Sequence, residues 1–317
     1  MRNPLSVITR ITLLLLSAAV TLSAQNPYAP DKPEPGSVEA IAKFVTDPRF
    51  TNPWVAYVPD SETVVSPSDY LKHIVGAPGE LSKVAAIHGY FRELARTSPR
   101  VKVETIGKSD EGREILLVIV SDAESMRDLE KLKAASAALA DPRTTNSEQA
   151  ESIIAASKPF YFFNAGLHSS ETGSPEMVME LAYRLAVSDH PMVQSIRRNV
   201  VVLINPVSEP DGRDRFVEWF YRHLKGKTDY ENLPPISPPY WGRYVFHDNN
   251  RDTHRAALET TRAVRRAFFE YHPVAVHDLH ESIALLLTWN GTGPFNPNLE
   301  PIVISEMFDM SFTEVRT

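Results

Sequence analysis

The chain has 317 residues, of which 43% are hydrophobic and 23% are charged, as is typical of a soluble globular protein with one large domain plus an appendage. Its 33 basic and 40 acidic residues give a formal charge of −7, and no dense basic patch indicates a nucleic-acid partner. It contains no cysteine, which excludes disulfides, thiolate metal ligands, a cysteine nucleophile and a lipoprotein attachment site.

Residues 1–24 are predicted to be a signal peptide. Arg2 and Arg10 precede an apolar run at 11–22, which is too short to span a bilayer comfortably. Cleavage after Ala24 would leave a secreted or periplasmic protein with no stable membrane span. A retained N-terminal anchor is the alternative.

The next part of the chain predicts a lead-in followed by a domain. Residues 25–65 are rich in proline and polar residues, and we expect an irregular lead-in that wraps the surface of a domain at 66–317. Apolar residues at helical spacing predict a helix over 68–95. Two strand-like runs, 101–106 and 115–120, predict a hairpin.

The central section alternates between strand and helix patterns. Residues 122–157 predict one or two surface helices with a break near Asp141. Strands are then expected at 160–163, 200–204 and 274–276, and helices at 175–187 and 256–271. This alternation predicts an α/β fold with a mixed, mostly parallel central sheet and helices on both faces. Four prolines in 232–240 predict an exposed loop.

One His-x-x-Glu occurs in the chain, formed by His168 and Glu171 directly after the first central strand. Open α/β sheets place their chemistry at the carboxyl ends of strands. Imidazole and carboxylate are zinc ligands, and a catalytic zinc takes three protein ligands and a water. By itself the pair is also compatible with a polar surface turn, and the third ligand must come from elsewhere.

Four further motifs accompany this pair in order along the chain. They are a hairpin turn at 106–113, an Asn-Pro-to-Asp-Gly turn at 205–212, an Asp-x-Asn-Arg motif at 248–251, and a strand that ends in Asp278-Leu-His280. Together the five resemble the zinc metallocarboxypeptidases of the carboxypeptidase A family. The resemblance runs from about Ser66 to the end of the chain.

The resemblance implies one zinc ion held by His168, Glu171 and His280. His280 fits the third ligand better than His277, because the ligand of the family closes an apolar-Asp-apolar-His run. In an alternating strand, His277 would also point to the face opposite Asp278. A core or surface role is the alternative for His280.

The resemblance also implies a substrate-binding clamp. Asn250 and Arg251 would bind the free carboxylate of a peptide or amide substrate, since a guanidinium fork matches a carboxylate. A polar loop in which Arg251 pairs with a neighbouring aspartate is the alternative. Arg243 would stabilise the oxyanion, with Arg213 and Arg215 as competitors.

Three departures from the family pattern stand out. Residues 207–210 interrupt the Asn-Pro-Asp-Gly turn, and Ser170 stands where pancreatic members have an arginine. The general-base glutamate and capping tyrosine of the family lie well beyond the third ligand, but only 37 residues follow His280 here. We therefore expect a truncated sequence that lacks its base, because neither Glu306 nor Glu314 is expected to serve.

The function implied is that of an exported zinc metallocarboxypeptidase that hydrolyses C-terminal peptide bonds. Two alternatives remain at this point. One is a zinc amidase or deacylase that acts on amides of amino acids or of peptidoglycan stem peptides, and the other is a non-catalytic binding domain on the same fold.

Overall fold

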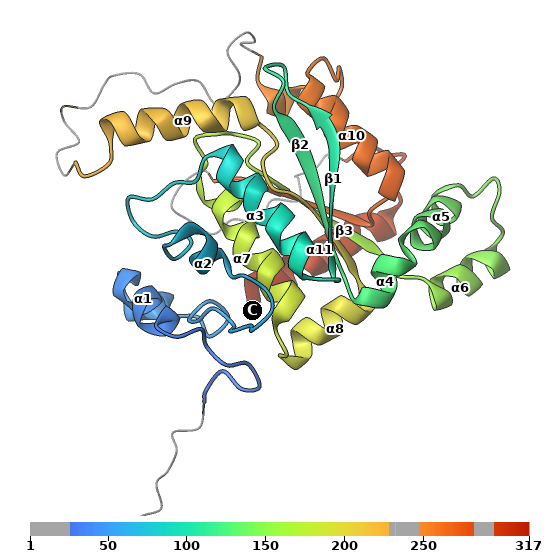
Figure 1. Cartoon of the computed structure of the whole chain (residues 1–317). Helices are drawn as coiled ribbons and strands as arrows, with labels where there is room; N and C mark the ends of the chain where they lie inside the picture. The colour runs from blue at the N-terminus through green and yellow to red at the C-terminus, as the bar shows by residue number, and fades with distance from the viewer. Residues whose placement is uncertain (1–25, 228–231, 233–246, 282–294, 317) are drawn as a thin grey trace, which may run out of the picture.

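A five-stranded mixed sheet forms the centre of the computed structural model, which describes residues 26–227, 232, 247–281 and 295–316 (Figure 1). The strands follow the order β1-β2-β4-β3-β5. Neighbours β1 and β2, and likewise β2 and β4, are antiparallel, whereas β3 is parallel to both β4 and β5. The bounds are β1 (Val101–Lys108), β2 (Glu114–Val120), β3 (Phe160–Ala165), β4 (Val201–Asn205) and β5 (Ala275–Leu279).

The two faces of the sheet bury alternate residues of the same strands, as a period of two requires. On β2, Val118 and Val120 belong to one core cluster, while Leu117 and Ile119 belong to the other. Both clusters are closed by helices, so the sheet is covered on its two faces. The expected mixed sheet with helices on both faces is confirmed. It is not mostly parallel among the described strands, because two pairings are parallel and two are antiparallel.

One face of the sheet is covered by α3 (Val84–Thr97), α7 (Gly173–Val187) and α8 (Pro191–Asn199), whose apolar residues join the first cluster. The other face is covered by α5 (Leu129–Ala140) and α10 (Glu259–Tyr271). The remaining helices are α1 (Ser37–Phe44), α2 (Pro67–Leu71), α4 (Ala123–Arg127), α6 (Ser147–Ala156), α9 (Pro210–His223) and α11 (Pro301–Arg316), with 3-10 turns η1 (Pro48–Phe50) and η2 (Asn249–Arg251).

The predicted helix over 68–95 is wrong in its middle part. The chain forms α2 and α3 there, separated by a turn that contains Pro78. Gly76 and Gly79 flank this proline with φ values of +75° and +81°, which are left-handed conformations that glycine adopts readily. Helical spacing of apolar residues continued across the break, so the periodicity did not reveal it.

The lead-in is less irregular than expected, because it contains α1. It attaches along α7, where Tyr183 donates its hydroxyl to the carbonyl of Pro59 at 2.7 Å. Ser188 donates to the Asp31 carboxylate at 2.6 Å. The predicted loop at 232–240 and the predicted signal peptide at 1–24 lie outside the described residues, except for residue 232. Over the part of the chain that is described, no helix is both long enough and apolar enough to cross a membrane.

Candidate metal centre

The ends of two neighbouring parallel strands bring the ligand candidates together. β3 and β5 pair in parallel, with Asn164 opposite Asp278 and Ala165 opposite Leu279. His280 follows β5 directly, and the loop that carries His168 follows β3. Because both strands end at the same edge of the sheet, residues 112 positions apart become neighbours.

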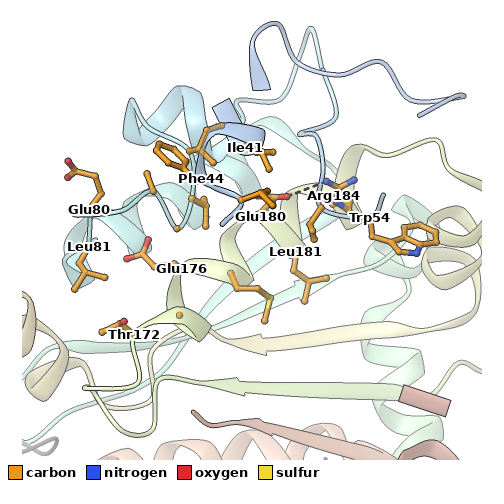
Figure 2. Close-up of a pocket in the computed structure, with 18 of the residues that line it drawn as sticks. Ile41, Phe44, Trp54, Glu80, Leu81, Thr172, Glu176, Glu180, Leu181 and Arg184 are labelled. Atoms are coloured by element: carbon orange, nitrogen blue, oxygen red, sulfur yellow. Dashed lines mark hydrogen bonds and ion pairs between the residues drawn. The ribbon is translucent and has the colours of Figure 1, made fainter. Parts of the chain in front are cut away.

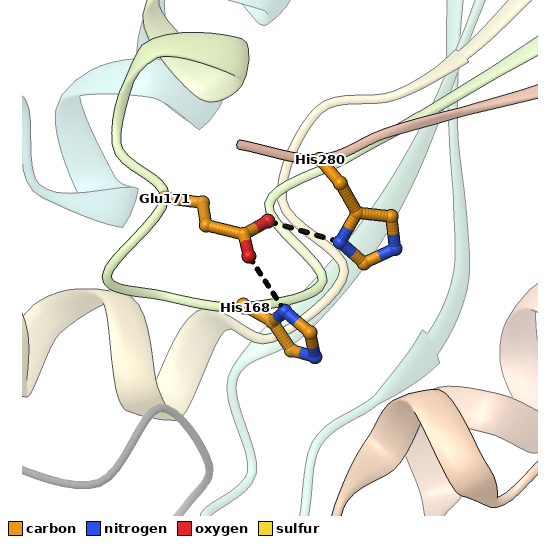
Figure 3. Close-up of side chains that lie close together, drawn as sticks. All are labelled: His168, Glu171 and His280. Carbon is orange, nitrogen blue, oxygen red and sulfur yellow. Dashed lines mark hydrogen bonds and ion pairs between the residues drawn. The ribbon is translucent and has the colours of Figure 1, made fainter. Parts of the chain in front are cut away.

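His168, Glu171 and His280 converge at this edge (Figure 3). The Nδ1 atom of His168 lies 2.8 Å from Oε1 of Glu171, and Nδ1 of His280 lies 2.9 Å from Oε2 of the same carboxylate. Three ligand atoms, one from each residue, lie within 4.8 Å of one another. Two imidazoles and a carboxylate at this spacing form a donor set of the kind that holds a catalytic zinc.

The second ring nitrogen of each histidine faces an aspartate. Nε2 of His280 lies 3.2 Å from Oδ2 of Asp278, and Nε2 of His168 lies 3.5 Å from Oδ1 of Asp248. Metal-binding histidines have outer partners of this kind, which fix the ring orientation. Asn164 in turn donates to Oδ1 of Asp278 at 2.8 Å. The two histidines are therefore oriented as ligands, which supports the fit of the site to a metal ion.

The electrostatic environment of His280 favours a positive charge. The hydrogen bond with Asp278 is the main cause that raises the pKa of His280 to about 9, while burial acts in the opposite direction and Glu171 adds to the increase. The carboxylates of Glu171 and Asp278 that hold a proton on this ring would equally attract a metal cation.

The loop after β3 is shaped by a tight backbone turn. Gly166 has a φ of +65°, and a Cβ there would lie 2.8 Å from Cγ of Pro175. The Glu171 N–H donates to the His168 carbonyl at 3.0 Å, so these two side chains leave the same turn. The His-x-x-Glu spacing therefore places both groups on one side of the loop, as expected.

The Asp-x-Asn-Arg motif is attached to this loop. The amide of Asn249 donates to the carbonyl of Leu167 at 2.6 Å, and Asp248 faces His168 as described above. Asn250 and Arg251 continue the same turn, η2. The structure thus brings the predicted clamp beside the predicted metal ligands.

The structure does not have the alternative arrangement in which Arg251 pairs with a neighbouring aspartate. Arg251 is exposed, and its Nη1 donates to the carbonyl of Asn250 at 3.0 Å. Among the described residues it forms no ion pair with Asp248 or Asp252. Asp252 instead accepts from the N–H groups of residues 257 and 258. The guanidinium of Arg251 is therefore accessible to a ligand.

The hairpin motif and the Asn-Pro-to-Asp-Gly motif meet each other at Asp211. This carboxylate is 1% exposed and accepts from the Ser109 hydroxyl at 2.6 Å and from Nη1 of Arg113 at 2.8 Å. The Glu111 N–H donates to its other oxygen at 3.0 Å. These two motifs therefore stabilise the β1–β2 turn against the start of α9.

Of the three arginines considered for the oxyanion, Arg213 lies inside the protein. Its Nη2 pairs with Glu176 at 2.5 Å, its Nε donates to Ser82, and its Nη1 donates to the carbonyl of Thr172 at 3.1 Å. It is 1% exposed and is committed to these partners. Arg243, the preferred candidate, lies outside the described residues.

His277, the rival for the third ligand, is not part of the candidate metal group. Its Nδ1 lies 3.4 Å from the Tyr161 hydroxyl and 3.9 Å from Oε1 of Glu314. It lies two residues before Leu279 on β5, on the face opposite Asp278 as the alternation predicted.

A large cavity lies apart from the candidate metal group. It has a volume of about 920 Å³ and lies between the lead-in and α7, where Trp54, Phe44 and Leu181 line it (Figure 2). Ser170 and Thr172 of the loop after β3 also border it, but none of the three ligand candidates does. The site is therefore located by the chemistry of its side chains and not by volume.

Sequence reasoning missed the outer partners of the site. Asp248 and Asp278 stand inside motifs that the sequence had singled out, so their positions carried a signal. Asn164 carried none beyond its place at the end of a strand.

A mixed sheet with a histidine-carboxylate-histidine group at its strand ends defines an α/β protein with a candidate metal centre. Residues 87–288, more than half of the chain, match the zinc carboxypeptidase family. The protein belongs to this family, as its motifs suggested. No curated protein matches the chain at a significant level.

Several solved structures of carboxypeptidases are similar to the chain. A carboxypeptidase A from Helicoverpa armigera is 17% identical with a TM-score of 0.40, covering 65% of this chain and 47% of its own. A metallo-carboxypeptidase from Burkholderia cenocepacia is 20% identical with a TM-score of 0.39, covering 62% and 40%. One from Pseudomonas aeruginosa, in complex with (2-guanidinoethylmercapto)succinic acid, is 17% identical with a TM-score of 0.38, covering 62% and 39%. This chain spans less than half the length of each of these proteins.

Proposed function

We propose that this protein is a zinc-dependent metallocarboxypeptidase that acts on the C-terminal end of peptides. The observation that carries the proposal is the position of η2 against the metal-bearing loop. Asn249 bonds to Leu167 and Asp248 faces His168. The turn with Asn250 and Arg251 therefore lies beside three convergent zinc-type ligands.

In this proposal His168, Glu171 and His280 hold one zinc ion. A zinc ion lowers the pKa of its bound water and polarises a carbonyl group. Asp248 and Asp278 orient the two imidazoles. The two aspartates contact the Nε2 atoms of the histidines. The Nδ1 atoms of both rings therefore stay directed at the Glu171 carboxylate, where the three candidate ligands meet.

Asn250 and Arg251 bind the free α-carboxylate of the substrate in this proposal. The guanidinium presents two parallel N–H groups to the two carboxylate oxygens, and the amide of Asn250 adds a directed donor. Recognition of a terminal carboxylate beside the metal would restrict cleavage to the last peptide bond.

Zinc content of the purified protein tests the proposal. We expect one zinc per wild-type molecule and loss of that zinc in His280→Ala. His277→Ala is the matched control and should keep the metal, because it removes a nearby histidine of β5 that lies outside the candidate group. Equal zinc in all three proteins would contradict the assignment.

We also propose that the protein is exported, as residues 1–24 suggest. The basic residues, the short apolar run and Ala24 support this. Expression in a bacterial host followed by mass spectrometry of the periplasmic fraction tests it. A protein recovered only with residues 1–24 attached would contradict cleavage.

A further inference from the structure

Glu281 connects the two segments that carry the ligand candidates. It follows His280 after the end of β5, and its backbone N–H donates to Oε2 of Glu171 at 3.0 Å. The same carboxylate oxygen lies 2.9 Å from Nδ1 of His280. One backbone amide therefore helps to fix the direction of a ligand that stands 110 positions earlier in the chain.

The side chain of Glu281 makes a second connection in the opposite direction. Its Oε1 accepts from the N–H of Gly173 at 2.6 Å. Gly173 is the first residue of α7, two positions after Glu171. The segment after β5 and the loop after β3 are thus joined by two hydrogen bonds, one to the Glu171 side chain and one to the backbone of Gly173.

The start of α7 needs this partner, because its own cap is missing. Thr172 occupies the N-cap position with helical backbone angles and makes no side-chain hydrogen bond to the first turn. The first N–H groups of a helix have no partner within the helix, and a carboxylate there is also favoured by the helix dipole. Glu281 supplies both the acceptor and the negative charge.

The absence of a side chain at Gly173 makes room for the bond. A Cβ at this position would lie 2.7 Å from Oε1 of Glu281. Any other residue would therefore push the carboxylate away from the N–H that it accepts from. On the other side of the loop, Arg213 donates to the carbonyl of Thr172 at 3.1 Å, so the backbone next to Glu171 is held from two directions.

We propose that Glu281 is a positioning residue that holds the ligand-bearing ends of β3 and β5 together, so that Glu171 and His280 keep their spacing. The proposal rests on the proposed zinc site. In this role Glu281 acts through its hydrogen bonds to Glu171 and Gly173. It does not belong to the group of candidate metal ligands.

Zinc affinity of the 317-residue protein, measured by competition with a chromogenic chelator, tests this role. Loss of a direct outer partner of a metal ligand lowers affinity by about 10–100-fold. Glu281→Ala keeps the backbone N–H that donates to Glu171 and removes only the bond to Gly173, so we expect a decrease at the low end of this range, about tenfold. Glu281→Gln keeps an acceptor oxygen and should restore affinity to within about threefold of wild type. Glu148→Ala is the matched control, because it removes an exposed glutamate from the first turn of another helix, α6.

Gly173→Ala provides an independent variant that keeps the carboxylate but displaces it, and it should also weaken zinc binding. Circular dichroism and the melting temperature in EDTA report folding separately from metal affinity. The proposal would be overturned if Glu281→Ala bound zinc as tightly as Glu148→Ala. It would also be overturned if Glu281→Gln bound zinc as weakly as Glu281→Ala. A wild-type protein that binds no zinc would instead overturn the proposed function, and this role with it.

Discussion

Glu176 and Arg213 form an ion pair in the interior of the protein, with 2.5 Å between Oε1 and Nη2. The two residues are 3% and 1% exposed. Glu176 also accepts from the N–H and hydroxyl of Ser82 at 2.6 and 2.9 Å. The pair joins α7, α9 and the segment before α3, and Arg213 reaches the loop after β3 at Thr172.

Removal of one partner of this pair should destabilise the protein. Arg213→Met leaves a buried carboxylate without its counter-charge, which costs about 3–5 kcal/mol in the free energy of unfolding. Urea denaturation followed by circular dichroism measures it. Arg222→Ala, an exposed position on the same helix, is the control and should change little. A double variant, Glu176→Leu with Arg213→Met, should lose less free energy of unfolding than Arg213→Met alone. A larger loss in the double variant would show that the unpaired charge is not the cause.

Substitution of the outer partner of His280 should weaken metal binding without unfolding the protein. Asp278→Asn keeps the size of the side chain but loses the charge that faces Nε2, so zinc affinity should fall by about 10-fold or more. Chelator competition measures this. Asp128→Asn is the matched control, since it neutralises an exposed aspartate that pairs with Lys131 at 3.3 Å. If both variants bound zinc with equal affinity, Asp278 would have no role in metal binding.

The clamp should distinguish a carboxylate from an amide. Arg251→Lys keeps the charge but loses the parallel N–H groups, so it should weaken binding of a carboxylate-ended peptide by about tenfold and that of its amide much less. Isothermal titration with both peptides measures the difference. Arg255→Lys, another exposed arginine in the same region, should leave both affinities unchanged. Equal losses for the two peptides would assign Arg251 a structural role.

Stability should fall as the pH rises, because of Glu209. Burial is the main cause that raises the pKa of this carboxyl from 4.5 to about 8, and Asp211 adds to it. The folded state therefore binds a proton that the unfolded state has already released. The contribution of the protonated Glu209 carboxyl to the free energy of unfolding is fully present below pH 4.5 and is lost as the pH rises through about 8.

Glu209→Gln keeps the acceptor for the Gly212 N–H, which donates to the Glu209 carboxyl at 3.4 Å, but it cannot ionise. Urea midpoints at about pH 5 and about pH 9 should therefore differ less in this variant than in wild type. Glu218→Gln, an exposed position on α9, should keep the wild-type difference. If Glu209→Gln showed the same difference in urea midpoint between the two pH values as wild type, the pH dependence would come from other groups.

The local pattern of the sequence predicted most strands and several helices. Runs such as 115–120 and 160–163 alternate or concentrate apolar residues, and a sheet that is buried on both faces needs such residues. The same pattern failed between α2 and α3, where apolar spacing continued through a turn. It also gave no indication of α9, whose start overlaps the Asp-Gly motif.

The sequence by itself determined the types of the candidate ligands and their places after strands, because His168, Glu171 and His280 stand in motifs with a fixed local spacing. Only the tertiary structure decided which groups face them. The pairing of Arg213 with Glu176 depends on how α7 packs against α9, and the contacts of Glu281 depend on β5 lying beside β3. Such contacts join residues 37 to 110 positions apart. Their geometry follows from packing across the whole sheet, whereas a motif records only the neighbours along the chain.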